Sequence, residues 1–393
     1  MMQDVVIVGA ARTPIGDFGG TLKDVSPIEL GVIAVNGAIA QAGINPNIVE
    51  ELGCGIILKH GHKGNPGRQI QLKCGMPVEG YAYTIDQMCS SGLKACEIAT
   101  HSIMLGKTDV AVAVGTENMS QTPYLLKYAR DGYRMGNGEL LDAMVYDGLV
   151  CAMADCLMGV TAENLAEKYG ITREEQDKLA LLSHERAVAA ITSGRFKEEI
   201  VPVTVSKRGR SVVVDKDEHP RDDLSMEKLA AMKPAFKKGG TITAGNASSI
   251  NDAAAALVLM SMEKARELGV KPLARIVSSA NAGAPPEIMG IGPAYAVPKA
   301  LKFAGLKQSD IGYYEINEAF AAQFLAVNRE LKIDMNKVNA NGSGISLGHP
   351  VGCNSIRMIV TMIPELRQRN ERYGLASLCA AGGPAIATII ERL

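Results

Sequence analysis

Three apolar runs in this chain are continuous rather than alternating with polar residues. They cover residues 4–9, 109–115 and 385–391, and each is too short for a typical helix. Continuous runs of this length are typical of strands that helices cover on both faces. The pattern therefore predicts three buried strands, at the start, near the first third and at the end of the chain.

Helices are expected between these strands. Thr172 and Glu175 form a capping-box pattern before a long apolar-periodic stretch, and Gly194 lies where that helix should stop. Strands that alternate with helices predict an α/β fold. Residues 120–244 are richer in charge and Met, contain turn-forming pairs and show one strong helix, so we interpret this region as a long insertion.

A weak internal echo favours a core of two halves. In the first half a turn at 89–92 leads into a helix of small residues and then a strand that ends at Gly115. In the second half a turn at 348–352 leads into a helix to about Arg369, and a strand follows into Gly382. Each half would then place reactive residues at the carboxyl edge of its sheet, where α/β folds build sites.

Length and composition limit the classes of function. A chain of 393 residues predicts two or three domains, and 47% hydrophobic residues allow a large core. The 41 Lys and Arg residues are balanced by 42 Asp and Glu residues, so the net charge does not favour binding to nucleic acid or to a membrane. The N-terminus lacks a signal-peptide pattern, and we expect a cytoplasmic protein.

The cysteines and histidines argue against disulfides and metal. Eight cysteines are scattered through a chain without a secretion signal, so free thiols are expected. Neither a Cys-x-x-Cys pair nor a His cluster with metal-ligand spacing occurs in the sequence. The sequence therefore predicts no metal site.

Cys89 is the first candidate for chemistry. It precedes a predicted helix on a Ser/Gly turn, where free backbone N–H groups and the helix dipole would lower the pKa of the thiol. Such a thiol is a candidate nucleophile, while the alternative is a small buried side chain that only packs.

Three further segments carry candidate polar groups. Asn317 stands in a segment expected to open a helix, His349 lies between turn-formers, and Cys379 precedes a glycine loop at 382–383. Each also has a purely structural interpretation. Asn317 could cap a helix, His349 could be a structural histidine whose hydrogen bonds are satisfied, and the glycines after Cys379 could form a tight turn. The local patterns alone leave both interpretations open.

Taken together and in this order, these segments resemble the thiolase family over essentially the whole chain. The matching stretches are 10–14, 68–69, 89–92, 115–120, 158–164, 243–248, 251–252, 289–293, 317–321 and 348–350. The region between them is most similar to the branch that forms acetoacetyl-CoA. The resemblance implies reversible Claisen condensation of two acetyl-CoA to acetoacetyl-CoA and CoA.

The resemblance also implies an architecture. Two similar βαβαβαββ halves would pack as a layered αβαβα core with an inserted loop domain. The first half would comprise residues 1–119 with 251–272, the loop domain residues 120–250, and the second half residues 273–393. Thiolases are dimers or dimers of dimers, so a homodimer or homotetramer is expected, with CoA thioesters as substrates and no cofactor.

Roles follow from the resemblance residue by residue. Cys89 would be acylated, and His349 would be the base that activates it. Cys379 would be the second acid/base, while Asn317 would hold a water that, with His349, stabilises the enolate oxygen. The backbone N–H groups of Cys89 and Ala381 would form a second oxyanion hole.

Coenzyme A would lie over the loop domain, although packing in the core is the alternative for each apolar position. The resemblance places these residues along the CoA path: Ala247 and Ser248 at the pantetheine, Arg221 at the nucleotide, and Leu149, Met158, Phe236, Met289, Ala319 and Phe320 along the tunnel.

Five positions differ from the usual family pattern. Asn354 and Ser355 replace a Ser-Gly pair, and Ser343 stands where Gly is usual. Ala381 adds a Cβ to the glycine loop, where a positive φ would strain it and a negative φ would leave its N–H usable. Leu157 stands where the acetoacetyl-specific branch usually carries His, which bears on the substrate.

Three alternatives follow. The chain could be a 3-ketoacyl-CoA thiolase for longer or branched acyl groups, which Leu157 would permit. It could be a degenerate homologue that binds acyl-CoA without turnover, against which the four retained polar residues argue. A dinucleotide site at 342–348 lacks a good preceding strand and a later acidic residue, so we discount it.

Overall fold

The apolar run near the N-terminus forms strand β1 (Val5–Arg12), in which every residue is buried. The computed structural model describes residues 3–207 and 209–393. The other two runs form β5 (Val110–Asn118) and β16 (Pro384–Arg392), as the sequence predicts. All three belong to one large sheet, whose strands follow the order β14-β15-β16-β13-β1-β12-β5-β3-β4, with β2 paired to β12.

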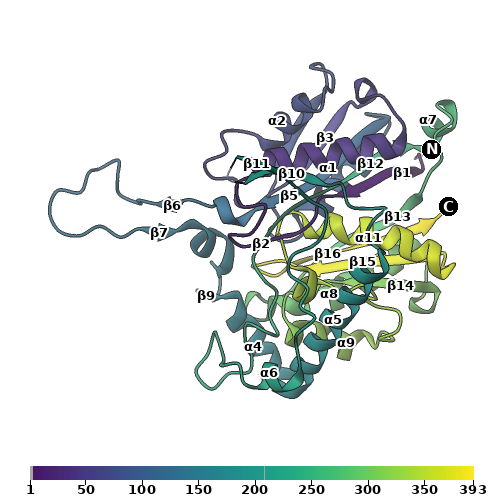
Figure 1. Ribbon diagram of the computed structural model, residues 1–393. Coiled ribbons are helices and arrows are strands. Elements are labelled where there is room, and N and C mark those ends of the chain that lie inside the picture. The colour runs from purple at the N-terminus through teal and green to yellow at the C-terminus, as the bar shows by residue number, and fades with distance from the viewer. Residues whose placement is uncertain (1–2, 208) are drawn as a thin grey trace.

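The sheet consists of two halves with the same plan (Figure 1). The remaining elements of the first half are β2 (Gly16–Asp17), α1 (Pro27–Ala42), β3 (Glu51–Gly55), α2 (Pro66–Lys73), β4 (Tyr81–Ile85), α3 (Ser91–Met104) and β12 (Asn251–Ser261). Those of the second half are β13 (Ala274–Gly283), α8 (Gly292–Ala304), β14 (Ile311–Ile316), α9 (Ala321–Leu331), α10 (Gly344–Leu347), α11 (Asn354–Arg369) and β15 (Tyr373–Cys379), and α7 (Met262–Glu267) connects the halves.

Strand pairing shows how the halves correspond. β3 is parallel to β5 in the first half, and β14 is parallel to β15 in the second. In each half the last strand returns antiparallel, β12 beside β5 and β16 beside β15. A short antiparallel ladder between β1 and β13 joins the halves, with Val6 opposite Arg275 and Ile7 opposite Ala274. The two-half echo in the sequence is therefore present in the fold.

Helices form layers around the sheet (Figure 1). α1 packs on β1, β5 and β12, whereas α8 packs on β13, β15 and β16 of the other half. α3 and α11 contact each other and strands of both halves, so they form the central layer. This arrangement is the layered αβαβα core that was expected, and it brings the starts of α3 and α11 together.

The inserted region holds more regular structure than the sequence analysis expected. Besides α5 (Arg173–Ser193) it contains α4 (Met158–Tyr169) and α6 (Met226–Ala230). Its strands are short pairs, β6 (Tyr124–Leu125) with β7 (Leu141–Asp142), β8 (Val150–Cys151) with β9 (Cys156–Leu157), and β10 (Val203–Lys207) with β11 (Arg210–Val214). The sequence analysis expected one strong helix in this region and did not identify α4. The buried face of α4 is formed partly by small residues such as Ala162 and Ala166, which give a weak apolar pattern.

The chain returns to the first half at Asn251, where β12 begins, and the second half begins with β13 at Ala274. The division into three domains at residues 119, 250 and 272 stays a prediction. Within the described residues, no helix is both long and apolar enough to cross a membrane.

The start of α5 gives a stability prediction. The Thr172 hydroxyl accepts the Glu175 N–H at 3.2 Å, and the Glu175 carboxylate accepts the Thr172 N–H at 2.7 Å, which forms the predicted capping box. Replacing Thr172 by Ala should lower the free energy of unfolding by about 1 kcal/mol, since it leaves a helix N–H without its cap. Urea unfolding followed by circular dichroism measures this difference.

Thr192→Ala is the control, because Thr192 is exposed near the other end of the same helix and caps nothing. It should change stability by a few tenths of a kcal/mol at most, in the favourable direction, as Ala is the better helix former. Equal losses in the two variants would show that the capping box contributes nothing.

Candidate active site

Cys89 lies in a tight turn between β4 and α3. The Ser91 hydroxyl donates to the Met88 carbonyl at 2.6 Å, and the Gln87 N–H donates back to the Ser91 hydroxyl at 2.9 Å. Met88 has a φ of 50°, a left-handed conformation that is uncommon outside glycine. α3 begins at Ser91, so the turn holds Cys89 just before the helix, as the sequence predicts.

The thiol of Cys89 is not acidic in this environment. Burial raises its pKa to about 12, although the backbone N–H groups of Ala381 and of Cys89 itself act in the opposite direction. The expectation that the helix start lowers this pKa is therefore wrong, because the loss of solvation outweighs the nearby donors. The same N–H groups are the pair that the resemblance assigns to an oxyanion hole, and both lie beside the sulfur.

His349 lies in the loop before α11. Its backbone N–H donates to the Asn251 carboxamide oxygen at 2.8 Å. The preceding Gly348 has a φ of 101°, and a Cβ there would come within 2.5 Å of the Asn251 side chain, so only glycine fits. Burial, together with the positive charge of Arg357, lowers the pKa of His349 to about 4, and the imidazole is neutral at pH 7.

Asn317 follows β14 at the carboxyl end of that strand. Its backbone N–H donates to the Ser377 carbonyl at 3.1 Å, and its carboxamide oxygen accepts from Asn354 at 2.7 Å. α9 begins only at Ala321, so the expectation that Asn317 opens a helix is wrong. The strand end instead places the side chain against the start of α11.

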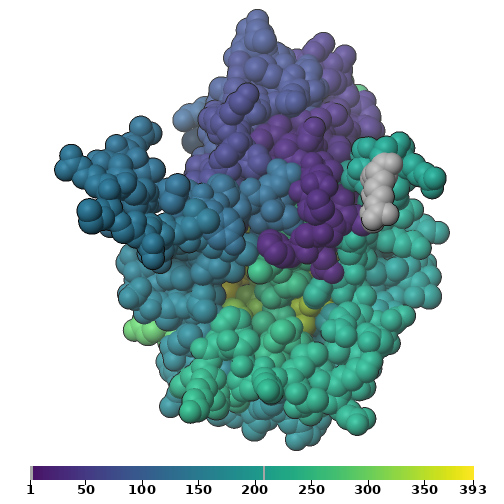
Figure 2. All heavy atoms as spheres, turned by 60° about the vertical axis from the view of Figure 1, so that its left-hand side comes forward, coloured from purple at the N-terminus to yellow at the C-terminus, as the bar shows by residue number. Residues whose placement is uncertain are grey.

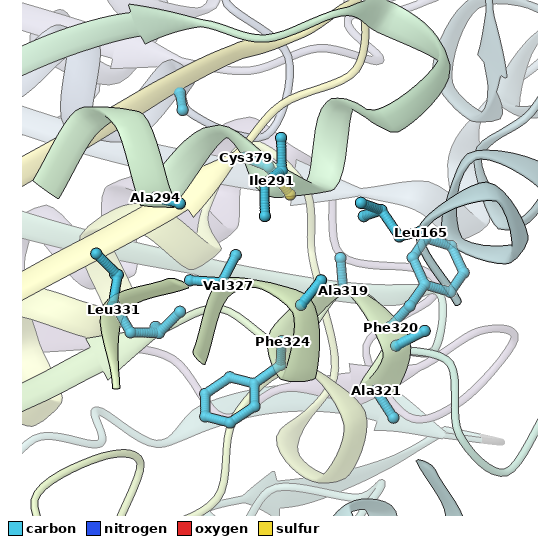
Figure 3. Packing of buried hydrophobic residues seen from close by; sticks show 14 of the residues in the cluster. Leu165, Ile291, Ala294, Ala319, Phe320, Ala321, Phe324, Val327, Leu331 and Cys379 are labelled. Atoms are coloured by element: carbon cyan, nitrogen blue, oxygen red, sulfur yellow. The ribbon is translucent and has the colours of Figure 1, made fainter. Parts of the chain in front are cut away.

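Cys379 is the last residue of β15 and is buried beside Ile291 (Figure 3). Burial raises the pKa of its thiol, and the nearby Cys89 would raise it further once charged. The two sulfurs therefore lie within electrostatic reach of one another. Both thiols are protonated at neutral pH in the resting protein.

The loop after Cys379 settles the question of strain at Ala381. Its left-handed residues are Gly382, with a φ of 82°, and Gly383, with a φ of 106°, whereas Ala381 is outside the left-handed region. A Cβ on Gly383 would lie 2.1 Å from the Ala284 carbonyl oxygen. Glycine is thus retained where the backbone needs it, and Ala381 keeps an unstrained N–H.

Two other altered positions, Ser343 and Ser355, are also accommodated. Ser343 has an extended backbone, with a φ of −152°, and its hydroxyl donates to the Ile316 carbonyl at 3.3 Å. The Ser355 hydroxyl accepts the Leu93 N–H at 3.0 Å near the start of α3.

The Gly-rich stretch at 342–348 forms the four-residue helix α10, which packs against Asn317. It is therefore not the strand-to-helix turn that a dinucleotide site requires.

Most residues assigned to the CoA path lie near these groups. Ala247, Met158, Met289, Ala319 and Phe320 belong to one buried cluster with Cys379 and Ala381, and Phe236 packs against it, its ring edge-to-face with Phe320 at 6.0 Å. Figure 3 shows Ala319 and Phe320 near Leu165. Ser248 donates its N–H to the Ala319 carbonyl at 2.9 Å, and Leu149 packs in a smaller cluster with Met88 and Cys89.

A cavity of about 510 Å³ borders the turn and the glycine loop, with Met88, Tyr146, Met153, Ala381 and Gly382 in its wall. Figure 2 shows a hollow in which residues near the C-terminus are visible between the inserted region and the first half. Arg221 is exposed and lines a different cavity, of about 590 Å³, beside α5. The structure therefore places Arg221 apart from the reactive groups.

Two residues in the site were not assigned a role by the sequence analysis. Asn354 was noted only as a departure from the family pattern, and Arg357 was not singled out at all. Arg357 is fully buried, which is rare for arginine and cannot be recognised from sequence alone. Their spacing of three residues on a helix, with Asn354 near His349, is the signal that could have found them.

Comparisons with known proteins identify the family of the chain. Residues 5–263 match the family model "Thiolase, N-terminal domain", and residues 270–392 match "Thiolase, C-terminal domain". The chain belongs to the thiolase family, and the resemblance and the fold it implies are confirmed.

Among curated proteins, the chain is similar to the acetyl-CoA acetyltransferase of Syntrophomonas wolfei, with 49% identity over 397 residues and full coverage of both chains. It is also 49% identical over 393 residues to the acetyl-CoA acetyltransferase of Escherichia coli K12, again with full coverage of both. Among solved structures, the S. wolfei enzyme superposes with a TM-score of 0.98 at 50% identity, covering 100% of each chain. Human mitochondrial 3-ketoacyl-CoA thiolase gives a TM-score of 0.97 at 38% identity, covering 100% of this chain and 99% of that one.

The depressed pKa of His349 predicts a pH dependence of stability. The unfolded chain takes up a proton on this residue below pH 6.5, whereas the folded protein does so only near pH 4. The stabilisation of the folded protein that arises from this difference in pKa is therefore complete above pH 6.5. It is lost as the pH falls from 6.5 to 4, by up to about 3 kcal/mol. Urea unfolding of wild type and His349→Gln at several pH values should show a difference that changes between pH 6.5 and 4.

His101→Gln serves as the control, since His101 is exposed at the end of α3. Its stability should stay within about 1 kcal/mol of wild type at every pH, the largest effect expected of a side chain at an exposed helix end. Parallel curves of stability against pH for His349→Gln and wild type would show that His349 takes up its proton equally well in the folded and the unfolded protein.

Proposed function

We propose that the protein is an acetyl-CoA C-acetyltransferase, which condenses two acetyl-CoA reversibly to acetoacetyl-CoA and CoA by a ping-pong mechanism through acetyl-Cys89. The observation that carries this proposal is the placement of the Cys89 sulfur beside the backbone N–H of Ala381 and within electrostatic reach of Cys379. Full-length similarity to acetyl-CoA acetyltransferases supports the substrate.

In the first half-reaction Cys89 attacks the thioester carbonyl of acetyl-CoA. Its proton passes to His349, the bond from carbonyl carbon to CoA sulfur breaks, and the Cys379 thiol gives its proton to the leaving CoA thiolate. The N–H groups of Cys89 and Ala381 stabilise the negative charge on the carbonyl oxygen. The products are acetyl-Cys89, protonated His349, the Cys379 thiolate and CoA.

In the second half-reaction the Cys379 thiolate removes a methyl proton from a second acetyl-CoA. His349 and Asn317, which holds a water, stabilise the enolate oxygen. The enolate carbon attacks the acetyl group, the bond to Cys89 breaks, and the Cys89 thiolate recovers its proton from His349. Every proton returns to its original residue, and the scheme uses thioesters and side chains without a cofactor.

The resting protonation states support this division. Cys89 and Cys379 are neutral thiols and His349 is a neutral imidazole, because all three lie in a buried site. A buried neutral site avoids the cost of unpaired charges until substrate arrives. Thiolate would then form during attack rather than before it.

Assembly into dimers or tetramers is part of the proposal. The β6–β7 arm projects from the body of the molecule (Figure 1) and exposes Tyr124, Tyr128 and Met135, the last of them 98% exposed. Strand β4 forms one edge of the large sheet. Exposed apolar side chains and an open strand edge both favour contact with another copy of the chain.

Acetylation of the enzyme tests the covalent step. Brief exposure to acetyl-CoA should leave one acetyl group on Cys89, measured by intact mass and peptide mapping. Cys379→Ser should still acetylate on Cys89 but should lose exchange of acetyl-CoA methyl protons with D₂O and lose condensation, by at least about 100-fold, as expected for removal of an acid/base group. His349→Ala should block acetylation itself.

Cys156→Ser is the matched control, since Cys156 is half-buried on β9 outside the reactive loops. It should acetylate and condense like wild type. Acetylation confined to a cysteine other than Cys89, or condensation by Cys379→Ser near the wild-type rate, would contradict the proposed roles.

The methyl group of Ala381 gives a prediction about chain length. It lies in the wall of the 510 Å³ cavity with an unstrained backbone, so its added volume should disfavour longer acyl chains more than acetyl. Overpacking costs roughly 1–3 kcal/mol, so Ala381→Gly should raise kcat/KM for longer 3-ketoacyl-CoAs at least about fivefold relative to acetoacetyl-CoA. Thiolysis rates with a series of 3-ketoacyl-CoAs measure this ratio.

Ala380→Gly separates volume from flexibility, because Ala380 is buried in the same loop but does not line the cavity. It should leave the chain-length ratio unchanged. A wild type that prefers long chains would favour the alternative of a 3-ketoacyl-CoA thiolase. A wild type without turnover would favour a degenerate acyl-CoA binder.

A further inference from the structure

Asn354 joins two of the residues proposed to act on substrate. It is the first residue of α11 and is fully buried. Its carboxamide nitrogen donates to the Asn317 carboxamide oxygen at 2.7 Å and lies 3.1 Å from Nδ1 of His349. Its carboxamide oxygen accepts from Nε of Arg357 at 2.9 Å. One amide therefore touches three side chains at once.

Arg357 fixes which way this amide points. A guanidinium can only donate, so the atom of Asn354 that faces it must be the oxygen, and the nitrogen must face Asn317 and His349. Arg357 is itself held by Glu315, with Nη1 3.1 Å from the carboxylate, and both side chains are inaccessible to solvent. Glu315 in turn accepts the Tyr313 hydroxyl at 2.7 Å. A flipped Asn354 would set two donors against each other in a buried place.

This orientation determines which atoms of the site carry hydrogen. The two hydrogens of the Asn354 nitrogen go to the Asn317 oxygen and to Nδ1 of His349, so Nδ1 must present a lone pair. The proton of a neutral imidazole then lies on Nε2. The carboxamide oxygen of Asn317 already accepts from Asn354, so its carboxamide nitrogen is the group that remains available to donate a hydrogen bond. Among the described residues, neither Nε2 of His349 nor the Asn317 nitrogen has a hydrogen-bond partner, and both are buried.

We infer that Asn354 is a positioning residue that makes His349 and Asn317 hydrogen-bond donors toward the substrate at the same time. This inference rests on the proposed function and deepens it. Two buried donors without acceptors suit an oxygen that becomes negative, as the thioester oxygen does when an enolate forms. The amide of Asn354 thereby sets both donors in the resting site. Once His349 has taken the proton of Cys89, Nε2 carries hydrogen in any case, and Asn354 then acts by keeping the Asn317 nitrogen turned toward the substrate.

The same arrangement opposes the first half-reaction. To take the proton of Cys89 on Nε2, His349 must hold its own proton on Nδ1, where it meets the donor hydrogen of Asn354. Asn354 therefore weakens His349 as a base while it strengthens it as a donor. A serine, which the family pattern has at this position, carries one hydroxyl hydrogen and can donate to only one of the two side chains.

The wild-type protein itself supplies the first test. In ¹⁵N-histidine-labelled protein at pH 7, two-bond ¹H–¹⁵N correlation spectra report which ring nitrogen carries the proton, and loss of the signal in His349→Gln assigns it. We expect His349 protonated on Nε2 and unprotonated on Nδ1. A proton on Nδ1 in wild type overturns the inference, whether or not acetyl-Cys89 forms.

Asn354→Asp supplies the second test, since a carboxylate is nearly the same size but can only accept. It should move the His349 proton to Nδ1 and turn the Asn317 amide so that its oxygen faces the substrate. Alkylation of Cys89 by iodoacetamide should then rise about tenfold, the effect of one pKa unit in the base. Exchange of acetyl-CoA methyl protons by enzyme already acetylated on Cys89, in which His349 is protonated, should fall at least tenfold because the Asn317 nitrogen no longer donates toward the enolate oxygen. The carboxylate would lie beside the Arg357 guanidinium, which limits the cost of burying it.

Opposite changes in the two rates are the expected signature, because damage to the fold would lower both. Asn354→Ser should change each rate in the same direction as Asn354→Asp and by less. Asn341→Ser is the matched control: Asn341 is a buried amide bonded to Glu365 at 2.9 Å, and its replacement should leave both rates and the His349 tautomer unchanged. If both rates fall in Asn354→Asp while the tautomer stays as in wild type, Asn354 has only a structural role. Absence of acetyl-Cys89 in wild type would instead count against the proposed function.

Discussion

Close packing among the start of α3, the start of α11 and strands β3 and β5 is the constraint on which the site depends. A Cβ on Gly92 would lie 2.7 Å from the Ser355 hydroxyl, one on Gly115 would lie 2.5 Å from the Gly352 carbonyl oxygen, and one on Gly55 would lie 2.4 Å from the Gly92 nitrogen. Glycine is the residue that permits such approach. The contact brings the Cys89 turn of one half against the His349 loop of the other.

A buried carboxyl group ties the same region together. Glu117, at the end of β5, accepts the backbone N–H groups of Ile57, Leu58 and Gly352 at 3.0–3.1 Å. It thus links the strand that ends near Cys89 to the loop that carries His349. Burial raises the pKa of Glu117 to about 8, while the three donors act in the opposite direction. These hydrogen bonds hold the region through its backbone and do not use the candidate catalytic side chains.

Much of the fold could be predicted from sequence because it depends on local patterns. Continuous apolar runs gave β1, β5 and β16, and the capping box with Gly194 gave both ends of α5. Order along the chain and family resemblance gave the candidate catalytic residues, whose roles stay predictions. The patterns could not predict how burial changes the pKa of a side chain. The helix start next to Cys89 suggested an acidic thiol, but the surrounding protein removes water from it and reverses the direction of the pKa shift. The role that we infer for Asn354 was hidden for a similar reason, since it depends on a buried arginine from the next turn of the helix.

The correspondence of the two halves has an evolutionary consequence. α3 and α11 occupy equivalent places, and two residues before the first residue of each helix stand Cys89 in one half and Gly352 in the other. A duplicated unit would at first have presented two alike helix starts to the shared interface. Here one copy carries the proposed nucleophile and the other carries the imidazole and amide proposed to act beside it, so the copies are complementary rather than redundant in the proposed mechanism. Such specialisation needs changes only in loops at the sheet edge, and the strands and central helices that both halves share can stay as they were.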